Sequence, residues 1–207
     1  MKYKIEESIT NAKRGKSKLV PDILSMQGMS SDWNRHLLNN ILEPGGNYLE
    51  VGVWHGSTFI SALYRNRVNA YAIDNWSEYN DDDSKRNFFM NCNRFGISGY
   101  VFFECDAFKV DLNKILDKID VFFYDGDHNY EQTKQSLSYF FPVLEDEFLF
   151  IVDDYGWEGV NFGVRDGIKE AGLDIVEKWE LFAKEPSDKD TWWNGLGIFK
   201  LRKYVES

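Results

Sequence analysis

The chain has 207 residues, of which 43% are hydrophobic and 16% are aromatic. A chain of this length and composition can bury one substantial core, which excludes a disordered protein. Its 34 acidic and 24 basic residues give a formal net charge of -10, which repels the phosphate backbones of nucleic acids. We therefore expect one folded domain that does not bind nucleic acid.

No apolar run approaches the ~20 residues needed to cross a bilayer, and the N-terminal sequence lacks the apolar core of a signal peptide. The two cysteines, Cys92 and Cys105, form neither a CxxC pair nor a dense secreted pattern. These features predict a cytoplasmic protein with no membrane partner. The sequence does not fix the oligomeric state, so a homo-oligomer remains an option.

The first 46 residues predict a helical extension. Apolar residues between positions 21 and 42 fall into two short helix-like groups, separated by a break at 28–31. The second helix is expected to be capped by Ser31 or Asp32. The stretch before these helices is rich in basic residues, and we interpret it as a solvated tail: Lys2, Lys4, Lys13, Arg14, Lys16 and Lys18.

From residue 47 onward, strands and helices alternate. Apolar runs predict strands over 48–53, 70–74, 100–106, 119–125 and 147–153, with helices over 84–95, 111–117, 130–140 and 159–171. Continuous apolar strands are typical of a parallel sheet covered by helices on both faces. Two final runs, 173–183 and 195–203, predict an antiparallel pair. The fold class is α/β, in a single domain with an extension at 1–46 and a core at 47–207.

Ligands of open parallel sheets bind beyond the carboxyl ends of the strands. The first such end carries Gly52 and Gly56, whose spacing is GxxxG and not the GxGxxG of dinucleotide-binding proteins. Ser57 and Thr58 follow at a helix start, where N–H groups and a hydroxyl suit an anion. Asp74 ends the second strand, in the position where an acidic residue binds ribose hydroxyls.

Five segments in this order resemble the class I S-adenosylmethionine (SAM)-dependent methyltransferases: LEVGVWHGST, AIDNW, ECDAF, VFFYDGDHNY and FIVDDYGW. The likeness spans about Tyr48 to Lys203. It is closest to the metal-dependent O-methyltransferases, both the catechol and caffeoyl-CoA group and the macrolide and aminocoumarin sugar group. The resemblance implies a Rossmann-like sheet of seven strands, mostly parallel, whose last strand is antiparallel.

The resemblance also implies the residues that bind SAM. Its methionine part would be surrounded by Glu50, Gly52, Trp54, Gly56, Ser57 and Thr58. Its nucleoside would be held by Asp74 at the ribose and by Asn75, Trp76, Asp106 and Ala107 around the adenine. Asp125 would lie beside the cofactor as well as at a metal. Trp54 departs from the family pattern, because many members have glycine there.

Asp125, Asp153 and Asp154 end two strands that are neighbours in this fold. Three carboxylates at one point repel one another unless a cation joins them, and an all-oxygen set favours Mg²⁺, with Mn²⁺ or Ca²⁺ as alternatives. A base must also remove the proton of an acceptor hydroxyl. We prefer His128 because imidazole titrates near neutrality, while Asp127 matches a carboxylate proposed as base in the sugar group.

Aromatic residues near the open edge could wall an acceptor site, namely Tyr155, Trp157, Trp192 and Trp193. The sequence therefore predicts a SAM-dependent methyltransferase that methylates a hydroxyl on a small molecule or sugar with the help of a divalent cation. Three alternatives stay open: a SAM-binding module without turnover, a metal-independent N-methyltransferase, and a nicotinamide-dependent oxidoreductase. A sugar hydroxyl, a catechol-like phenol and a small metabolite all fit the same motifs as acceptor.

Overall fold

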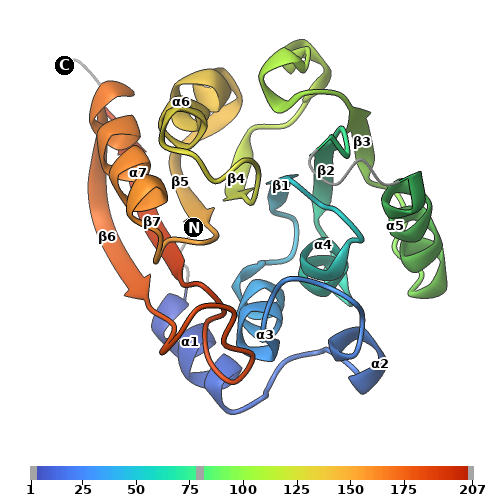
Figure 1. Cartoon of the computed structure of the whole chain (residues 1–207). Helices are drawn as coiled ribbons and strands as arrows, with labels where there is room; N and C mark the ends of the chain where they lie inside the picture. The colour runs from blue at the N-terminus through green and yellow to red at the C-terminus, as the bar shows by residue number, and fades with distance from the viewer. Residues whose placement is uncertain (1–3, 78–81, 205–207) are drawn as a thin grey trace.

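The computed structural model of the chain describes residues 4–77 and 82–204. Its centre is a seven-stranded sheet with the order β3-β2-β1-β4-β5-β7-β6 (Figure 1). The strands are β1 (Asn47–Val51), β2 (Asn69–Asp74), β3 (Val101–Glu104), β4 (Ile119–Tyr124), β5 (Leu144–Val152), β6 (Leu173–Leu181) and β7 (Leu196–Lys203).

The sheet is parallel except at one strand. β7 lies between β5 and β6 and runs antiparallel to both, whereas β1 to β5 pair in parallel. The predicted Rossmann-like fold with an antiparallel last strand is thereby confirmed. The predicted strand ends differ from the observed ends by up to three residues, as expected for boundaries set by hydrogen bonding rather than by side-chain pattern.

Helices cover both faces of the sheet because the central strands are apolar on both sides. In β4, Val121 and Phe123 belong to one core, whereas Phe122 and Tyr124 belong to the other. The helices α1 (Ile5–Lys13), α2 (Pro21–Leu24), α3 (Asp32–Ile41), α4 (Ser57–Leu63) and α5 (Asp82–Arg94) contribute to the first core. The second core contains α6 (Tyr130–Phe140) and α7 (Glu158–Glu170).

Short 3-10 turns complete the chain at η1 (Ala107–Lys109), η2 (Leu112–Lys114) and η3 (Phe141–Val143). The helix predicted over 111–117 is therefore wrong, since only η2 forms there. The Asp111 carboxylate accepts a hydrogen bond from the Asn113 backbone N–H at 3.2 Å. Such a local bond offers the backbone an alternative to the helix ladder.

The interpretation of the basic N-terminal stretch as a solvated tail is also wrong over α1. Ile5, Ile9 and Ala12 are buried on one face of this helix, which packs against α3. Their spacing is that of an amphipathic helix. Lys2, like residues 1 and 3 of the predicted extension and 205–207 of the predicted core, lies outside the described residues.

The two predicted helices of the extension are confirmed as α2 and α3. Ser31 caps α3, and its hydroxyl oxygen accepts a hydrogen bond from the Asn34 backbone N–H at 3.2 Å. Within residues 4–77 and 82–204, no helix combines the length and apolar character that a bilayer span requires.

Candidate active site

A cavity of about 690 Å³ opens at the carboxyl ends of the parallel strands. Backbone hydrogen bonds tie the strand tips together, from Gly52 N to Ile73 O at 2.9 Å, from Asp125 N to Val51 O at 2.8 Å and from Asp153 N to Tyr124 O at 3.1 Å. The cavity lies within the size range of small-molecule sites. Of the site residues predicted from the sequence, the structure places these on its wall: Gly52, Trp54, Ser57, Thr58, Asp74, Asn75, Trp76, Asp106, Ala107, Asp125, Asp127, His128, Asp153 and Asp154.

The first turn requires glycine for two reasons. Gly52 has a φ of 84°, and a Cβ atom there would lie 1.9 Å from the Asp125 carbonyl oxygen. Gly56 has a φ of 87° and is the N-cap of α4. Both values lie in the left-handed region that glycine adopts without steric cost. Gly56 itself does not line the cavity, so the structure supports a conformational role for it.

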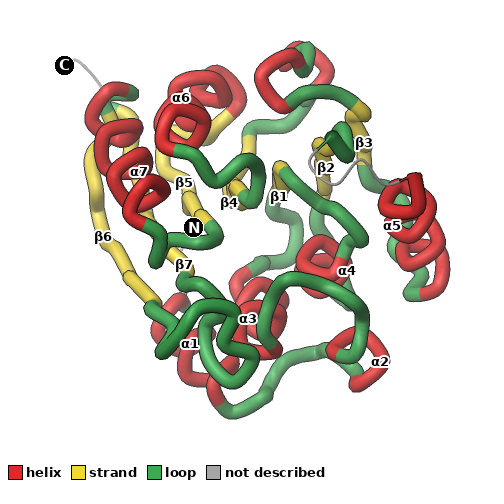
Figure 2. Tube along the Cα trace, in the orientation of Figure 1, coloured by secondary structure: helices red, strands yellow, loops and turns green. Residues whose placement is uncertain are grey.

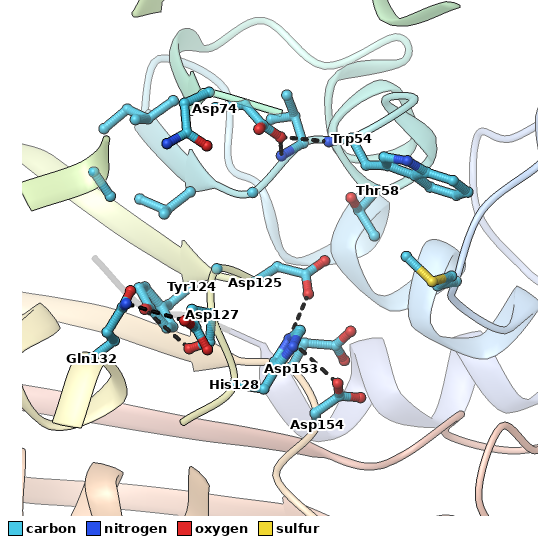
Figure 3. Close-up of a pocket in the computed structure, with 18 of the residues that line it drawn as sticks. Trp54, Thr58, Asp74, Tyr124, Asp125, Asp127, His128, Gln132, Asp153 and Asp154 are labelled. Atoms are coloured by element: carbon cyan, nitrogen blue, oxygen red, sulfur yellow. Dashed lines mark hydrogen bonds and ion pairs between the residues drawn. The ribbon is translucent and has the colours of Figure 1, made fainter. Parts of the chain in front are cut away.

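Asp74 fastens the first turn to the end of β2. One carboxylate oxygen accepts hydrogen bonds from the backbone N–H groups of Val53 at 2.9 Å and Trp54 at 2.8 Å, and the other accepts from Trp76 N at 2.7 Å. Figure 3 shows Asp74 and Trp54 side by side on this wall. The carboxylate thus shapes the cavity at the position predicted for ribose.

Glu50 is fully buried and does not line the cavity. Thr58 donates a hydrogen bond to one of its carboxyl oxygens at 2.6 Å, and the Tyr48 hydroxyl donates to the other. Burial raises the pKa of Glu50 to about 8, against the lowering effect of these two donors. Glu50 therefore acts on the cavity through Thr58, which does line it.

The wall beyond β2 and β3 is partly aromatic. The Trp76 ring stacks on Phe102, with centroids 5.2 Å apart, and its Nε1 donates to Trp54 O at 3.2 Å. Asp106 accepts a hydrogen bond from Phe108 N at 2.9 Å. That bond, followed by the nearby Lys109 ammonium, lowers the pKa of Asp106.

His128 lies across the cavity, among the carboxylates that follow β4 and β5 (Figure 3). Its Nε2 atom is 3.3 Å from Asp125 Oδ1 and 3.3 Å from Asp154 Oδ2. The Trp157 ring meets the imidazole edge-on at 5.4 Å between centroids. Asp154 is itself held by Asn194, whose side-chain amide donates to its other oxygen at 2.7 Å. The ring is therefore positioned from several sides.

Asp153 is the most deeply buried carboxyl of this group, with 3% of its surface exposed, and its Oδ1 atom has no hydrogen-bond partner. Burial, together with the negative charges of Asp125 and Asp154, raises the pKa of Asp153 well above its usual value. An unpartnered buried oxygen that faces a cavity is a site where a bound donor or cation would be stabilised.

The arrangement of the side chains does not support the cation site predicted at Asp125, Asp153 and Asp154. Among the described residues, no group of three or more histidine, cysteine, aspartate or glutamate side chains is arranged to hold a metal ion. The oxygen donors are of the kind that Mg²⁺ prefers, but the contacts that two of them make are with the His128 ring.

The alternative base, Asp127, is more exposed than His128 and is turned toward α6. Its carboxylate accepts a hydrogen bond from the Gln132 side chain at 3.1 Å, and its backbone oxygen accepts one from the Tyr124 hydroxyl at 3.3 Å. These contacts leave His128 nearer the carboxylate cluster. The predicted aromatic wall is present in part, because Trp157 and Trp193 line the cavity whereas Tyr155 and Trp192 are buried away from it.

Sequence reasoning missed Asn129 and Gln132, at the start of α6, and three residues from loops elsewhere in the chain: Met29, Ser187 and Asn194. The segment between β6 and β7 lies beside α1 and α3 (Figure 2). Its Thr191 carbonyl accepts a hydrogen bond from Ser31, and Trp192 packs edge-on against Trp33 at 5.3 Å. No local sequence pattern marks such a contact across the whole chain.

Backbone strain gathers at the same place. Among the described residues, six that are not glycine have a positive φ, and all but Arg65 line the cavity: Trp54, Trp76, Asp154, Ser187 and Trp193. Non-glycine residues in this region cost of order 1–3 kcal/mol each and cluster at functional sites. This clustering agrees with the placement of the active site.

Several solved structures share the fold. TrmN from Thermus thermophilus has 14% identity and a TM-score of 0.60 over 88% of this chain and 52% of that one, so the chain spans about half of its length. A precorrin 8w decarboxylase from Methanobacterium thermoautotrophicum has 19% identity and a TM-score of 0.62, over 90% and 100% of the two chains. A proposed O-methyltransferase from Klebsiella pneumoniae has 14% identity and a TM-score of 0.60, over 96% and 89%. At these identities the likeness establishes the fold alone.

A comparison with curated protein sequences found no significant match. Residues 49–155, just over half of the chain, match a family described as a methyltransferase domain. This segment runs from β1 to the residues that follow β5, and so it includes the first turn, Asp74 and the residues around His128. The chain therefore belongs to the methyltransferase domain family, and its fold is that of the class I SAM-dependent methyltransferases.

Proposed function

We propose that this SAM-dependent methyltransferase transfers the methyl group to a hydroxyl oxygen of a small molecule or sugar, with His128 as the general base. The observation that carries the proposal is the position of His128. Its Nε2 atom faces Asp125 and Asp154 at 3.3 Å each, in the same cavity as the glycine turn of β1. A hydroxyl is a poor nucleophile until it loses its proton, so a positioned imidazole suits this reaction.

The cavity fits SAM because its wall combines a glycine cradle with polar and flat surfaces. Gly52 lets the first turn pack closely against the backbone of Asp125, where a Cβ atom would be 1.9 Å from the carbonyl oxygen, and Trp76 offers a ring face. We assign Trp54, Ser57 and Thr58 to the methionine part, supported from behind the wall by Glu50 and Gly56. The nucleoside would be held by Asp74, Asn75, Trp76, Asp106 and Ala107.

When bound, SAM supplies a methyl group on a positively charged sulfur. Transfer to the acceptor oxygen would form an O–CH₃ bond, break the S–CH₃ bond and leave a neutral thioether. His128 takes the hydroxyl proton. For this to happen, the acceptor hydroxyl must replace either Asp125 or Asp154 as a neighbour of Nε2. Asp125 and Asp154 orient the ring and stabilise the positive charge that it gains.

The divalent cation stays part of the proposal, with Asp125, Asp153 and Asp154 as its ligands. The unpartnered Asp153 Oδ1 atom and the oxygen chemistry of the cluster favour it. No step of the base mechanism above is routed through this cation.

A small acceptor is favoured over a nucleic acid by the charge of the cavity. Its described lining includes six aspartates and neither lysine nor arginine. Proteins that bind nucleic acids rely on basic side chains to contact phosphates. The excess of acidic residues in the whole chain acts in the same direction.

Labelled SAM, incubated with the protein and fractionated host metabolites, tests the proposal when products are read by mass spectrometry. We expect one methyl group to be gained on a hydroxyl-bearing compound. His128→Ala should lower kcat by ~10²- to 10⁴-fold, with partial recovery at higher pH, where hydroxide replaces the base. Asp127→Asn, the matched control, should keep most of the activity.

Each component of the proposal can fail separately in this assay. A methyl group found on nitrogen would indicate N-methylation, and SAM binding without any product would indicate a module without turnover. If the pH–rate profile of His128→Ala equals that of the parent protein, the base is Asp127 or solvent. Turnover that is lost in EDTA and restored by Mg²⁺ supports the cation, whereas turnover unchanged in EDTA rejects it.

A further inference from the structure

Arg35 of α3 is a buried guanidinium, with 2% of its surface exposed. Its Nη1 atom donates to the backbone carbonyl oxygens of Ile23 at 3.1 Å, Leu24 at 2.8 Å and Met26 at 3.0 Å. Its Nε atom donates to the Ser30 hydroxyl at 3.0 Å. These bonds hold the end of α2 and the segment that leads to α3, so one half of the guanidinium has a structural role.

The other half of the guanidinium has no such partners. No described carboxylate lies within ion-pair distance of Arg35, and Nη2 makes no hydrogen bond to any described residue. Burial lowers the pKa of Arg35, and the negative charge of Asp32 on the same helix only partly opposes this effect. A buried cation without an ion-pair partner is costly, and in folded proteins it is usually paired. The free edge of Arg35 is therefore a place where a bound anion would be stabilised.

That edge lies beside Gly28 and near Ser57; Ser57 lines the cavity, whereas Gly28 and Arg35 lie one layer behind its wall. A Cβ atom on Gly28 would be 2.6 Å from Arg35 Nη2 and 2.1 Å from the Ser57 hydroxyl oxygen, so both donors border the same point. Ser57 lines the cavity, and its hydroxyl makes no hydrogen bond to a described residue. The absence of a side chain at Gly28 is what allows the two groups to approach each other.

SAM carries one carboxylate, on its methionine part. The described lining of the cavity offers that carboxylate six aspartates and no lysine or arginine. We propose that Arg35, through Nη2 and together with the Ser57 hydroxyl, binds the carboxylate of SAM from behind the Gly28–Met29 turn. This inference depends on SAM binding at the first turn and not on the identity of the acceptor, so it can fail while the proposed methyl transfer stands.

Calorimetry with two product analogues tests the role of the carboxylate directly. S-adenosylhomocysteine has the carboxylate, whereas 5′-deoxy-5′-(3-aminopropylthio)adenosine lacks it and keeps the amine, the thioether and the nucleoside. Arg35→Lys keeps a positive charge but cannot present the Nη2 edge. We expect it to weaken S-adenosylhomocysteine ~10- to 100-fold and to change the binding of the decarboxylated analogue less than about twofold.

Ser30→Ala is the matched control, because it removes a partner of Arg35 Nε while leaving Nη2 in place. Any effect of Ser30→Ala on binding should be the same for the two analogues. Ser57→Ala removes the second donor and should weaken only S-adenosylhomocysteine, which keeps the test usable if Arg35→Lys fails to fold. Equal weakening of both analogues by Arg35→Lys, or no weakening of either, would overturn the proposal. Equal weakening of both analogues by Ser57→Ala would also overturn it.

Discussion

At the scale of single residues, Asp74 combines a structural and a binding role. Its carboxylate accepts three backbone hydrogen bonds, from Val53, Trp54 and Trp76, and it is also the residue proposed to bind the ribose. A carboxylate has about four lone-pair positions, so an additional hydroxyl donor can be accommodated. Removing it leaves three N–H groups without their acceptor, two of them at the turn that we propose to contact the cofactor.

We expect Asp74→Ala to weaken S-adenosylhomocysteine binding by ~1.5 to 3 kcal/mol and to lower the thermal unfolding temperature as well, because both roles are lost. Calorimetry and thermal unfolding measure the two effects. Asn75→Ala, at a neighbouring position of the cavity wall, is the control and should leave the unfolding temperature nearly unchanged. Unaltered affinity in a folded Asp74→Ala protein would remove this residue from the site.

The placement of most candidate residues at the cavity could be predicted because each follows a strand whose end the sequence marks. Asp74, Asp125 and Asp153 come directly after apolar runs, and parallel strands bring such ends to one edge. Glu50 was predicted beside the cofactor, and in the structure it is buried and does not line the cavity, because β1 is covered on both faces. Met29 at the cavity, and Arg35 in the role that we propose for it, depend on packing between distant segments, which no local sequence pattern predicts.

At the scale of elements, the link between β1 and α4 depends on Gly52, and Gly45 of the same chain provides a comparison that tests this dependence. Gly45 has a φ of 83° with no atom within 4 Å of a Cβ position, whereas Gly52 has a φ of 84° with Asp125 O at 1.9 Å. The two positions share a left-handed backbone conformation and differ in the space available to a Cβ atom.

Gly45→Ala should therefore cost about 1–2 kcal/mol of unfolding free energy, the cost of a left-handed conformation alone. Gly52→Ala should cost clearly more and should weaken S-adenosylhomocysteine binding, because Asp125 must move away from the new methyl group. Chemical denaturation and calorimetry on both variants provide the comparison. Equal stability losses, with cofactor binding intact, would show that the contact with Asp125 relaxes without consequence.

The elements that could be predicted are those with a strong apolar pattern, such as β4 and the second half of β5, where buried residues face both sides of the sheet. The helix expected over 111–117 failed because the Asp111 side chain stabilises a competing turn. α1 was hidden by its basic residues, although Ile5, Ile9 and Ala12 carry a helical spacing. The prediction for that segment relied on its basic composition, whereas the spacing of its apolar residues indicated the helix correctly.

At the scale of the whole molecule, buried acids couple folding to pH. Glu50 has a pKa of about 8 in the folded protein and an ordinary value of 4.5, because burial penalises its charged form. Below pH 4.5 the group is protonated in both states, and its contribution to stability is fully present. As pH rises from 4.5 to 8, the unfolded chain loses this proton while the folded protein keeps it, so the free energy of unfolding falls.

Glu50→Gln removes this titration while keeping an acceptor for the Thr58 hydroxyl. Relative to the parent protein, the variant should gain stability steadily between pH 4.5 and 8, by an amount on the order of a few kcal/mol. Denaturant titrations at several pH values measure the difference, with Glu6→Gln on the exposed face of α1 as the control. Some slope should remain in the variant, because burial and neighbouring charges also raise the pKa of Asp153. Parallel curves for the parent and Glu50→Gln across this window would mean that Glu50 is already ionised when folded, and that its two hydroxyl partners outweigh its burial.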